Sequence, residues 1–448
     1  MPSRDRDAQP SPLWTRQFLA VAATEFWERF AIYGVKSLLV LILIDRILTG
    51  DIRHVAGAAM MRDVSMALFG PVSVTGLASQ LYGYANALVY LSIPLGGLIG
   101  DMVGNRRWTV MGGGAAMVAG LMLMLNDASF LVGLLPFAIG TGLLKGNLSV
   151  QVGQMFADEA QRRRGYTVYL GFLNAGAICG PLVCGAVAAF AEPISALMVA
   201  AAAVVVGLAF YIALGRGIAS VAPATQTATT RHDRFPATGL LIVALASVYL
   251  CFAAYEQLGN IFLIWARSRV DLSLAGWTMP VSWFLSLDGL FTLALIAGWQ
   301  MVLRMLERRG MGVSAMTQIW LGGLSCAAGY MLLAAGSMMH GPLSAGWTIL
   351  YLLLMDAAIV LIWPSGLSLI AEMAPRRLTG LWTGLFYLHG FFAHLWVGMI
   401  GVYYDRMTTP AFWMLHAGVA GAGASMALIA GVARLHHRSL RQAINISA

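Results

Sequence analysis

Charged residues are scarce in this sequence. Of its 448 residues only 11% are Asp, Glu, Lys or Arg, and 59% are hydrophobic, whereas soluble proteins average about 25% charged and about 45–50% apolar residues. Apolar runs of about twenty residues, the length of a membrane-spanning helix, recur along the whole chain. These runs are continuously apolar and do not alternate, which excludes a transmembrane barrel. The composition predicts a polytopic, all-α membrane protein.

Cysteine is also scarce, with only four residues, and each lies within an apolar run. This pattern indicates neither a disulfide framework nor a metal cluster, so we expect no metal site and no cofactor. The net charge of +8 comes from arginines in short clusters between apolar runs. Such clusters orient a protein in the membrane, and we exclude a nucleic-acid partner.

The apolar runs predict twelve transmembrane helices. They cover residues 17–44, 74–100, 107–125, 129–154, 166–190, 194–214, 238–266, 275–303, 314–337, 343–371, 378–403 and 410–433. The polar stretch 215–237 reads as a linker between two six-helix bundles, residues 1–214 and 238–448. Loop arginines are concentrated on the side of the N-terminus, which predicts an inner-membrane protein with both termini and the linker in the cytoplasm.

Several charged residues nevertheless lie inside the predicted spans. Lys36 and Lys145 are the only lysines of the chain, and inserting such a charge costs about 2.5–3.5 kcal/mol or more. Five acids accompany them: Glu25, Glu28, Glu256, Asp288 and Asp356. One interpretation is a set of purely structural ion pairs. We favour a functional role, because apolar contacts can replace buried ion pairs with little loss of stability.

The first span carries a stripe of polar residues on one helix face. Glu25, Arg29, Tyr33 and Lys36 follow each other at spacings of four, four and three residues. Glu25 and Arg29 form an i, i+4 pair that can neutralise itself, which leaves Glu28 and Lys36 to find partners elsewhere. Lys145 is the candidate partner. Such a face suits a small zwitterion or a proton relay.

The same residues carry a resemblance to a known family. The run from Glu25 to Gly34, EFWERFAIYG, is similar to the E-x-x-E-R-F-x-Y-Y-G signature of the proton-dependent oligopeptide transporters, a branch of the major facilitator superfamily. The similarity continues over nearly the whole chain, in Tyr90, Gly96-Gly97, Asp101, Arg106-Arg107, Gly140 to Asn147, Asn174 to Gly176, Pro181, Tyr255 to Gln257, Pro364 to Ser368 and Ala374-Pro375.

The resemblance implies a symporter that imports di- or tripeptides with protons by alternating access, powered by the proton gradient. It assigns proton coupling to Glu25, Glu28, Arg29, Lys145 and Glu256. It assigns substrate binding to Arg29, Tyr33, Lys36, Tyr90, Lys145, Asn174 and Glu256. Asp101, Arg106 and Arg107 match a loop motif of the superfamily, which implies a role in gating. The expected partners are a small peptide, protons and membrane lipids, and we expect the chain to act as a monomer.

The sequence also departs from the family. An acid that holds the peptide amino group in the family is replaced here by Ile359, and Ile32 replaces one of the paired tyrosines. Asp356 or Asp288 could substitute for the missing acid, so we include both among the substrate-binding candidates. A transporter of a drug, modified amino acid or metabolite stays open, as does a membrane sensor that does not transport. We find no nucleophile beside a base and expect no enzyme.

Two histidines lie on the eleventh span. His389 and His394 are interpreted mainly as hydrogen-bond donors between helices, with His389 kept as a pocket candidate. Tyr255 and Phe252 lie near Glu256 in the sequence and are further pocket candidates.

Overall fold

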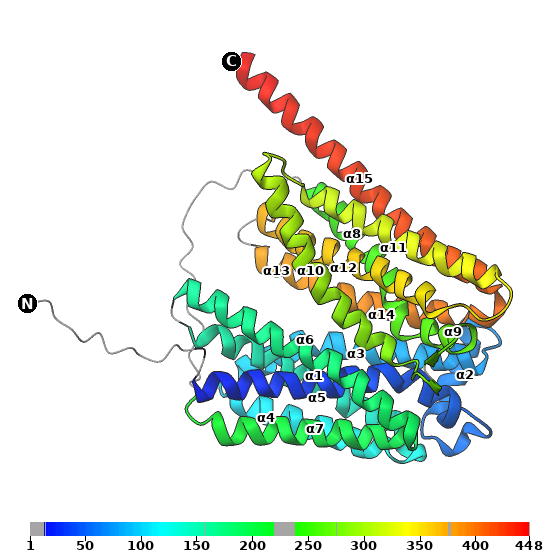
Figure 1. Ribbon diagram of the computed structural model, residues 1–448. Helices are drawn as coiled ribbons and strands as arrows, with labels where there is room; N and C mark the ends of the chain where they lie inside the picture. The colour runs from blue at the N-terminus through cyan, green and yellow to red at the C-terminus, as the bar shows by residue number, and fades with distance from the viewer. Residues whose placement is uncertain are drawn as a thin grey trace, which may run out of the picture. The chain divides into compact units, whose positions relative to one another are not determined.

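A computed structural model describes residues 13, 15–156, 158–218, 238–274, 276–374 and 378–447 (Figure 1). The chain divides into two compact units. The first unit consists of Met1–Val35 and Ser92–Thr225, and the second of Lys36–Leu91 and Gln226–Ala448. Most of the predicted linker, residues 219–237, lies outside the described residues, and the division into two six-helix bundles stays a prediction.

The described chain is almost entirely helical. Its first half contains α1 (Arg16–Ile42), α2 (Ala58–Phe69), α3 (Val74–Val103), α4 (Arg106–Met124), α5 (Phe130–Gln154), α6 (Glu159–Phe190) and α7 (Pro193–Leu214), with short helical turns η2 (Leu43–Ile47), η3 (Ile52–His54) and η4 (Asp127–Ser129). Its second half contains α8 (Thr238–Tyr255), η5 (Glu256–Gly259), α9 (Ile261–Arg269), β1 (Ser273–Leu274), β2 (Trp277–Thr278), α10 (Trp283–Arg308), α11 (Ala315–Met338), α12 (Ala345–Met373), α13 (Thr379–Tyr387), α14 (His389–Gly401), η7 (Tyr404–Arg406) and α15 (Thr409–Ser447).

The predicted spans agree closely with these helices. Among the described residues, ten helices are long and apolar enough to cross a membrane. The other two predicted spans correspond to α1 and α4, which have 27 and 19 residues. A span of about 20 residues crosses the hydrocarbon core, so the all-α, twelve-span fold class is confirmed.

Several boundaries differ from the prediction. α6 begins at Glu159 and not at 166, and α15 ends at Ser447 and not at 433. α10 begins at Trp283 and not at 275, because a hairpin precedes it in which Ser273 pairs with Thr278 and Gly276 has φ +88°. The seventh span is interrupted by η5, which separates α8 from α9. The eleventh span is interrupted at Leu388, between α13 and α14.

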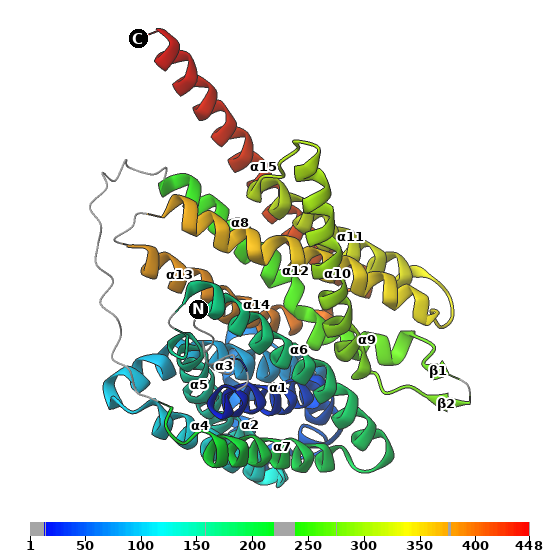
Figure 2. The same ribbon diagram turned by 60° about the vertical axis from the view of Figure 1, so that its left-hand side comes forward.

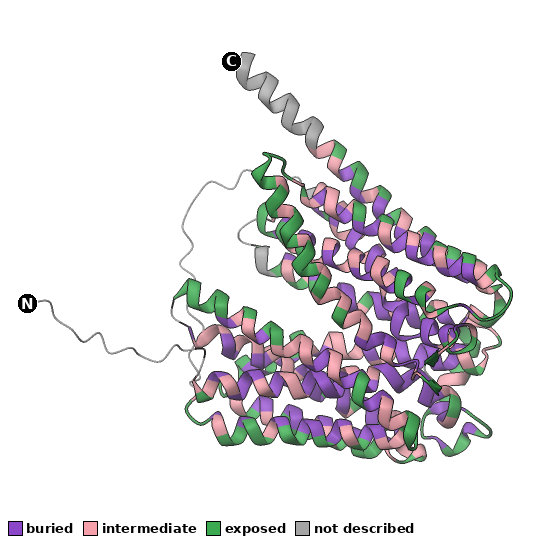
Figure 3. Ribbon diagram, viewed as in Figure 1, coloured by how far each residue is buried: buried purple, intermediate pink, exposed green. Residues whose placement is uncertain are grey.

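In the first unit, α4 packs against α5 and α7, and α6 packs against α7. α6 also passes very close to α1. A Cβ atom added at Gly176 would lie 2.2 Å from the backbone oxygen of Phe26, so only glycine permits this approach. α7 carries exposed residues along its length (Figure 3). Val205 and Phe210 are among its exposed apolar residues, which suits contact with lipid tails.

In the second unit, α8 packs against α11, α12, α14 and α15 (Figures 1 and 2). The aromatic core around it includes Tyr330, Tyr351 and Trp413, all fully buried. Because η5 follows α8 directly, the packing of α8 fixes the position of Glu256 at the start of η5.

Candidate functional site

The first polar group, which we call the α1 cluster, consists of Glu25, Glu28, Arg29 and Tyr169 in the first unit. Arg29 Nε lies 3.0 Å from Glu25 Oε1 and 2.9 Å from Glu28 Oε2. Tyr169 of α6 donates a hydrogen bond of 2.5 Å to Glu25 Oε2. Glu25, Glu28 and Arg29 are 0%, 1% and 5% exposed. These side chains thus form one dense network inside the protein.

The predicted Glu25–Arg29 pair is confirmed, but one expectation about Glu28 is wrong. Arg29 contacts both acids, since the adjacent residue Glu28 lies within reach of the same guanidinium. Glu28 therefore has a partner on its own helix. The predicted attraction between Lys145 on α5 and the Glu28 carboxylate is also confirmed.

The predicted gating residues also lie together in the first unit. Arg106 forms an ion pair with Asp101 and donates to Asn147 Oδ1 at 2.7 Å. Arg107 donates to the carbonyl oxygen of Gly215 at 3.1 Å, at the end of α7. The loop between α3 and α4 is thus tied to α5 and to the C-terminal end of α7. Its role in gating stays a prediction.

The second polar group, the Glu256 cluster, consists of Lys36, Tyr90, Glu256 and His394 in the second unit. Lys36 Nζ lies 3.0 Å from Glu256 Oε2. His394 Nε2 lies 3.3 Å from the same oxygen, and the Tyr90 ring stacks on the His394 ring with centroids 5.1 Å apart. The seventh-span acid therefore meets the first-span lysine that was expected to need a partner.

Two further acids of the second unit form a carboxyl pair. Asp288 on α10 and Asp356 on α12 are close enough to share a hydrogen bond. Tyr255 donates to Asp288 Oδ1 at 3.1 Å, and Thr292 donates to Asp356 Oδ1 at 2.7 Å. Asp356 is fully buried. Because Tyr255 is adjacent to Glu256 in the chain, the pair and the Glu256 cluster are neighbours.

The remaining predicted residues are placed as follows. Tyr33 lies near enough to Arg29 to interact electrostatically with its guanidinium. Asn174 donates to the backbone oxygen of Leu170 at 2.8 Å, a bond within its own helix. Whether Tyr33 and Asn174 contact a substrate stays a prediction.

Sequence reasoning missed Tyr169 and Thr292, and it assigned His394 no role beside Glu256. His394 lies far from Glu256 in the sequence, and no spacing rule connects a helix residue with a side chain on another element. Thr292 lies inside an apolar run, where threonine commonly satisfies its own helix backbone. Tyr169 is an aromatic residue in another apolar run, where its ring suits the apolar surroundings. Neither therefore carried a signal of a carboxylate partner.

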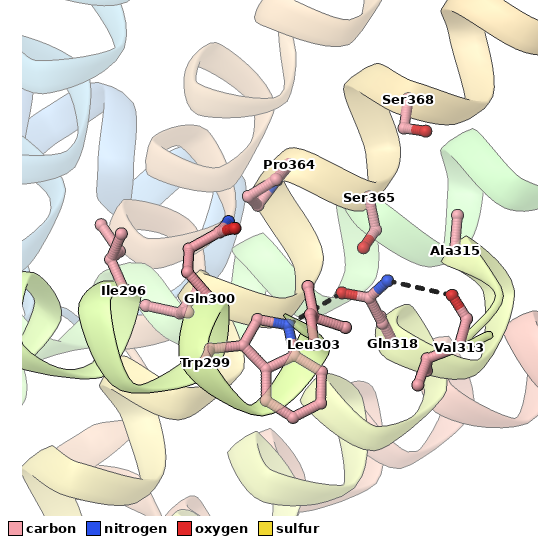
Figure 4. Close-up of a pocket in the computed structure, with 11 residues that line it drawn as sticks. Ile296, Trp299, Gln300, Leu303, Val313, Ala315, Gln318, Pro364, Ser365 and Ser368 are labelled. Carbon is pink, nitrogen blue, oxygen red and sulfur yellow. Dashed lines mark hydrogen bonds between the residues drawn. The ribbon is translucent and has the colours of Figure 1, made fainter. Parts of the chain in front are cut away.

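A separate pocket of about 230 Å³ lies between α10, α11 and α12 (Figure 4). Trp299 donates to Gln318 Oε1 at 3.0 Å on its wall, and Ser365 and Ser368 line its other side. None of the predicted site residues lines this pocket. It is therefore distinct from both polar clusters and from the carboxyl pair.

Comparison with known proteins places this arrangement in a family. The chain is 25% identical to the uncharacterized transporter YclF of Bacillus subtilis, with 87% of each chain covered. It is 24% identical to a di-/tripeptide transporter of Lactococcus lactis subsp. cremoris, covering 80% of this chain and 84% of the relative. A crystal structure of a peptide transporter POT in complex with sulfate has the same fold, with a TM-score of 0.78, 21% identity and 96% of each chain covered.

The sequence pattern of the Major Facilitator Superfamily matches residues 30–398. The chain therefore belongs to the Major Facilitator Superfamily and is a multi-pass membrane protein. Within that superfamily, its resemblance to the proton-dependent oligopeptide transporters is confirmed by the similarity to these relatives over most of their length.

Proposed function

We propose that this protein is a proton-coupled symporter that imports di- or tripeptides, or peptide-like zwitterions, by alternating access. The observation that carries the proposal is the ion pair between Lys36 and Glu256, with a distance of 3.0 Å and largely buried partners. Protonation of Glu256 removes one charge of this pair and leaves the other uncompensated in a low dielectric. A proton can therefore shift the balance between two conformations that hold or release the pair.

The charges inside the protein match the two ends of a peptide. Arg29, Lys145 and Lys36 are the proposed attraction for the substrate carboxylate, with Tyr33, Tyr90 and Asn174 contributing polar contacts. Asp288 and Asp356 are the proposed partners of the substrate ammonium. The positive charge of Lys36 is already balanced by Glu256. The two adjacent aspartates of the carboxyl pair therefore require protons or a positively charged ligand, which suits them to this role.

The α1 cluster and the gating residues complete the proposal. Glu25 and Glu28, held by Arg29, are proposed to exchange protons together with Glu256. Asp101, Arg106 and Arg107 are proposed to stabilise one conformational state. We place the protein in the inner membrane with both termini in the cytoplasm, acting as a monomer with protons, a peptide and membrane lipids as partners. The proton gradient supplies the energy, and no cofactor is required.

Glu256→Gln tests the proposal. The amide cannot be ionised, so the variant should lose uphill, pH-driven uptake of labelled dialanine in proteoliposomes. It should retain some counterflow, because exchange of substrate across the membrane requires no net proton movement. Glu372→Gln is the control, since Glu372 pairs with Arg434 at the end of α12. Full accumulation by Glu256→Gln would contradict the role of Glu256, and no dialanine counterflow by the wild type would contradict peptide transport.

A second candidate function is transport of a non-peptide substrate by the same fold. It is favoured by Ile359, which stands where the resemblance expects the acid that binds the peptide amino group. Competition with labelled substrate by a panel of di- and tripeptides and by amino acid derivatives separates the two candidates. Competition by the derivatives alone would support the second.

A further inference from the structure

Among the groups that the proposed function leaves unused, His394 of α14 has the most informative surroundings. Its side chain is 0% exposed. Nδ1 lies 2.9 Å from the backbone oxygen of Gly390, one helical turn earlier. A carbonyl oxygen only accepts hydrogen bonds, so Nδ1 must carry a proton. In the neutral ring, Nε2 is then an unprotonated acceptor.

Nε2 faces a second acceptor. It lies 3.3 Å from Glu256 Oε2 and forms no hydrogen bond of ordinary geometry with any of the described residues. A neutral His394 beside an ionised Glu256 would set two lone pairs against each other where water is excluded, which is unfavourable. One proton on this contact removes the conflict. It can be bound to Nε2, which gives an imidazolium beside a carboxylate, or to Oε2, which gives a carboxylic acid beside a neutral ring.

The neighbouring groups decide where that proton resides. Lys36 donates to the same Oε2 at 3.0 Å, which favours the carboxylate and therefore a proton on Nε2. The ring of Tyr90 stacks on His394 and that of Tyr82 lies 6.4 Å away. His389 on the same helix adds an electrostatic interaction with His394. Tyr255, Tyr330 and Asp288 act electrostatically on Glu256.

We propose that His394 is a proton-carrying residue that loads and unloads a proton together with Glu256. While Lys36 holds Glu256, the proton stays on His394 Nε2. When Lys36 turns to the substrate carboxylate, the Nε2–H bond breaks, an Oε2–H bond forms on Glu256, and the imidazole becomes neutral. No other reactant is needed. This inference rests on the proposed function, because it specifies how the Glu256 cluster couples protons to transport.

His416 on α15 supplies a matched control. It is equally buried, and its Nδ1 also lies 2.9 Å from the backbone oxygen one turn earlier. In the part of the chain that the structure describes, His416 forms no ion pair with an acid and its surroundings are aromatic, with Phe412 and Tyr330 nearby. His394→Gln keeps a donor near the position of Nε2, and His394→Asn keeps one near Nδ1, but neither amide exchanges a proton at physiological pH.

The experiment compares wild type, His394→Gln, His394→Asn and His416→Gln in proteoliposomes. We expect both His394 variants to lose most of the pH-driven dialanine accumulation, because neither amide exchanges a proton, and to keep counterflow near the wild-type rate. His416→Gln should keep both activities. Unchanged accumulation and pH profile in the His394 variants would overturn the proposal. So would a parallel loss of counterflow, or failure of both variants to fold, because either result indicates a structural role.

A second measurement does not depend on the cargo. Nuclear magnetic resonance of the ¹⁵N-histidine-labelled wild type reports whether each ring nitrogen carries a proton, and the His394 signals are those missing from the His394 variants. We expect the protonation of His394 Nε2 to change with pH and with Glu256→Gln, and that of His416 to be unaffected by Glu256→Gln. Identical behaviour of the two histidines would overturn the inference. Absence of dialanine counterflow in the wild type would contradict the proposed function alone.

Discussion

At the scale of single residues, Tyr169 shows how a buried acid is stabilised. Its hydroxyl donates to Glu25 Oε2 at 2.5 Å, and both side chains lie in the interior. Tyr169→Phe removes the donor and leaves a carboxylate oxygen buried without it. Leaving a buried group without its hydrogen-bond partner lowers the free energy of unfolding by about 1–3 kcal/mol. We therefore expect a lower melting temperature and reduced dialanine uptake.

The control for this change is Tyr166→Phe on the same helix. Tyr166 donates to the backbone oxygen of Ser149 at 3.0 Å, in a partly buried position. Loss of this hydrogen bond should lower the free energy of unfolding by a smaller amount, about 0.5–1.5 kcal/mol, and should leave the transport rate unchanged. Equal effects of the two substitutions on melting temperature and uptake would show that the Glu25 contact has no special importance.

The carboxyl pair allows a test of substrate recognition. Asp356→Asn removes one of the two acids proposed to meet the substrate ammonium, so the KM for dialanine should rise by about tenfold, equivalent to about 1.4 kcal/mol. Uptake of N-acetylated dialanine, which has no ammonium group, should be unaffected. Asp288→Asn in the same assay identifies which acid contributes more.

Thr292→Val is the matched control, because it removes the hydrogen bond to Asp356 at 2.7 Å and keeps both charges. It should raise the KM less than Asp356→Asn does. An unchanged KM for dialanine in both aspartate variants would assign the pair a purely structural role.

The sequence predicted the identity of the charged residues better than their pairing. Glu25 and Arg29 could be paired because helix geometry alone brings them together. The contacts of Glu256 with Lys36 and His394 could not, because they depend on how separate helices pack. Glu28 was assigned a partner on another span for a different reason: adjacent helix residues do not ordinarily face each other, although the Arg29 guanidinium does reach Glu28.

At the scale of elements, Gly176 permits the close packing of α6 on α1. Gly176→Ala would place a Cβ atom 2.2 Å from the backbone oxygen of Phe26, which requires the helices to move apart. Overpacking of this kind costs about 1–3 kcal/mol. We expect a lower melting temperature and, because Tyr169 is on the moved helix, weaker transport.

Gly171→Ala on the same helix is the control for Gly176→Ala. A Cβ atom added there meets nothing within 4 Å, and alanine favours a helix over glycine by about 1 kcal/mol. This variant should melt at or above the wild-type temperature. A Gly176→Ala variant as stable as Gly171→Ala would mean that α6 and α1 need no close contact.

Helix positions were predictable because about twenty apolar residues in a row have few alternatives in a membrane. The interruptions were not. Residues 256–259, Glu-Gln-Leu-Gly, form the short helical turn η5 within a span that was predicted to be continuous. The hairpin before α10 was missed because its residues, Ser273 to Thr278, are apolar enough to resemble the start of a span.

At the scale of the whole molecule, the distribution of arginines predicts the orientation. A green fluorescent protein fused to the C-terminus should fluoresce, and alkaline phosphatase in the same position should be inactive, because both report a cytoplasmic location. Phosphatase inserted after Asp51, between α1 and α2, should be active. The opposite pattern at both sites would invert the proposed topology.

The division of the chain into two six-helix bundles around a polar linker at 215–237 stays a prediction. The compact units group residues 36–91 with the second half of the chain. A linker is visible in composition. The grouping of helices depends on packing that composition does not record.

The interruption of the seventh span has a consequence for solvent. Within a bilayer, non-helical backbone is tolerated only inside protein or against water. The side-chain amide of Gln257 and the Oδ1 of Asn260 are buried without a hydrogen-bond partner among the described residues. Ordered water molecules are the ordinary means of satisfying such groups. We therefore expect hydration at the depth of Glu256, so that hydronium ions can approach this carboxylate through a short chain of water molecules.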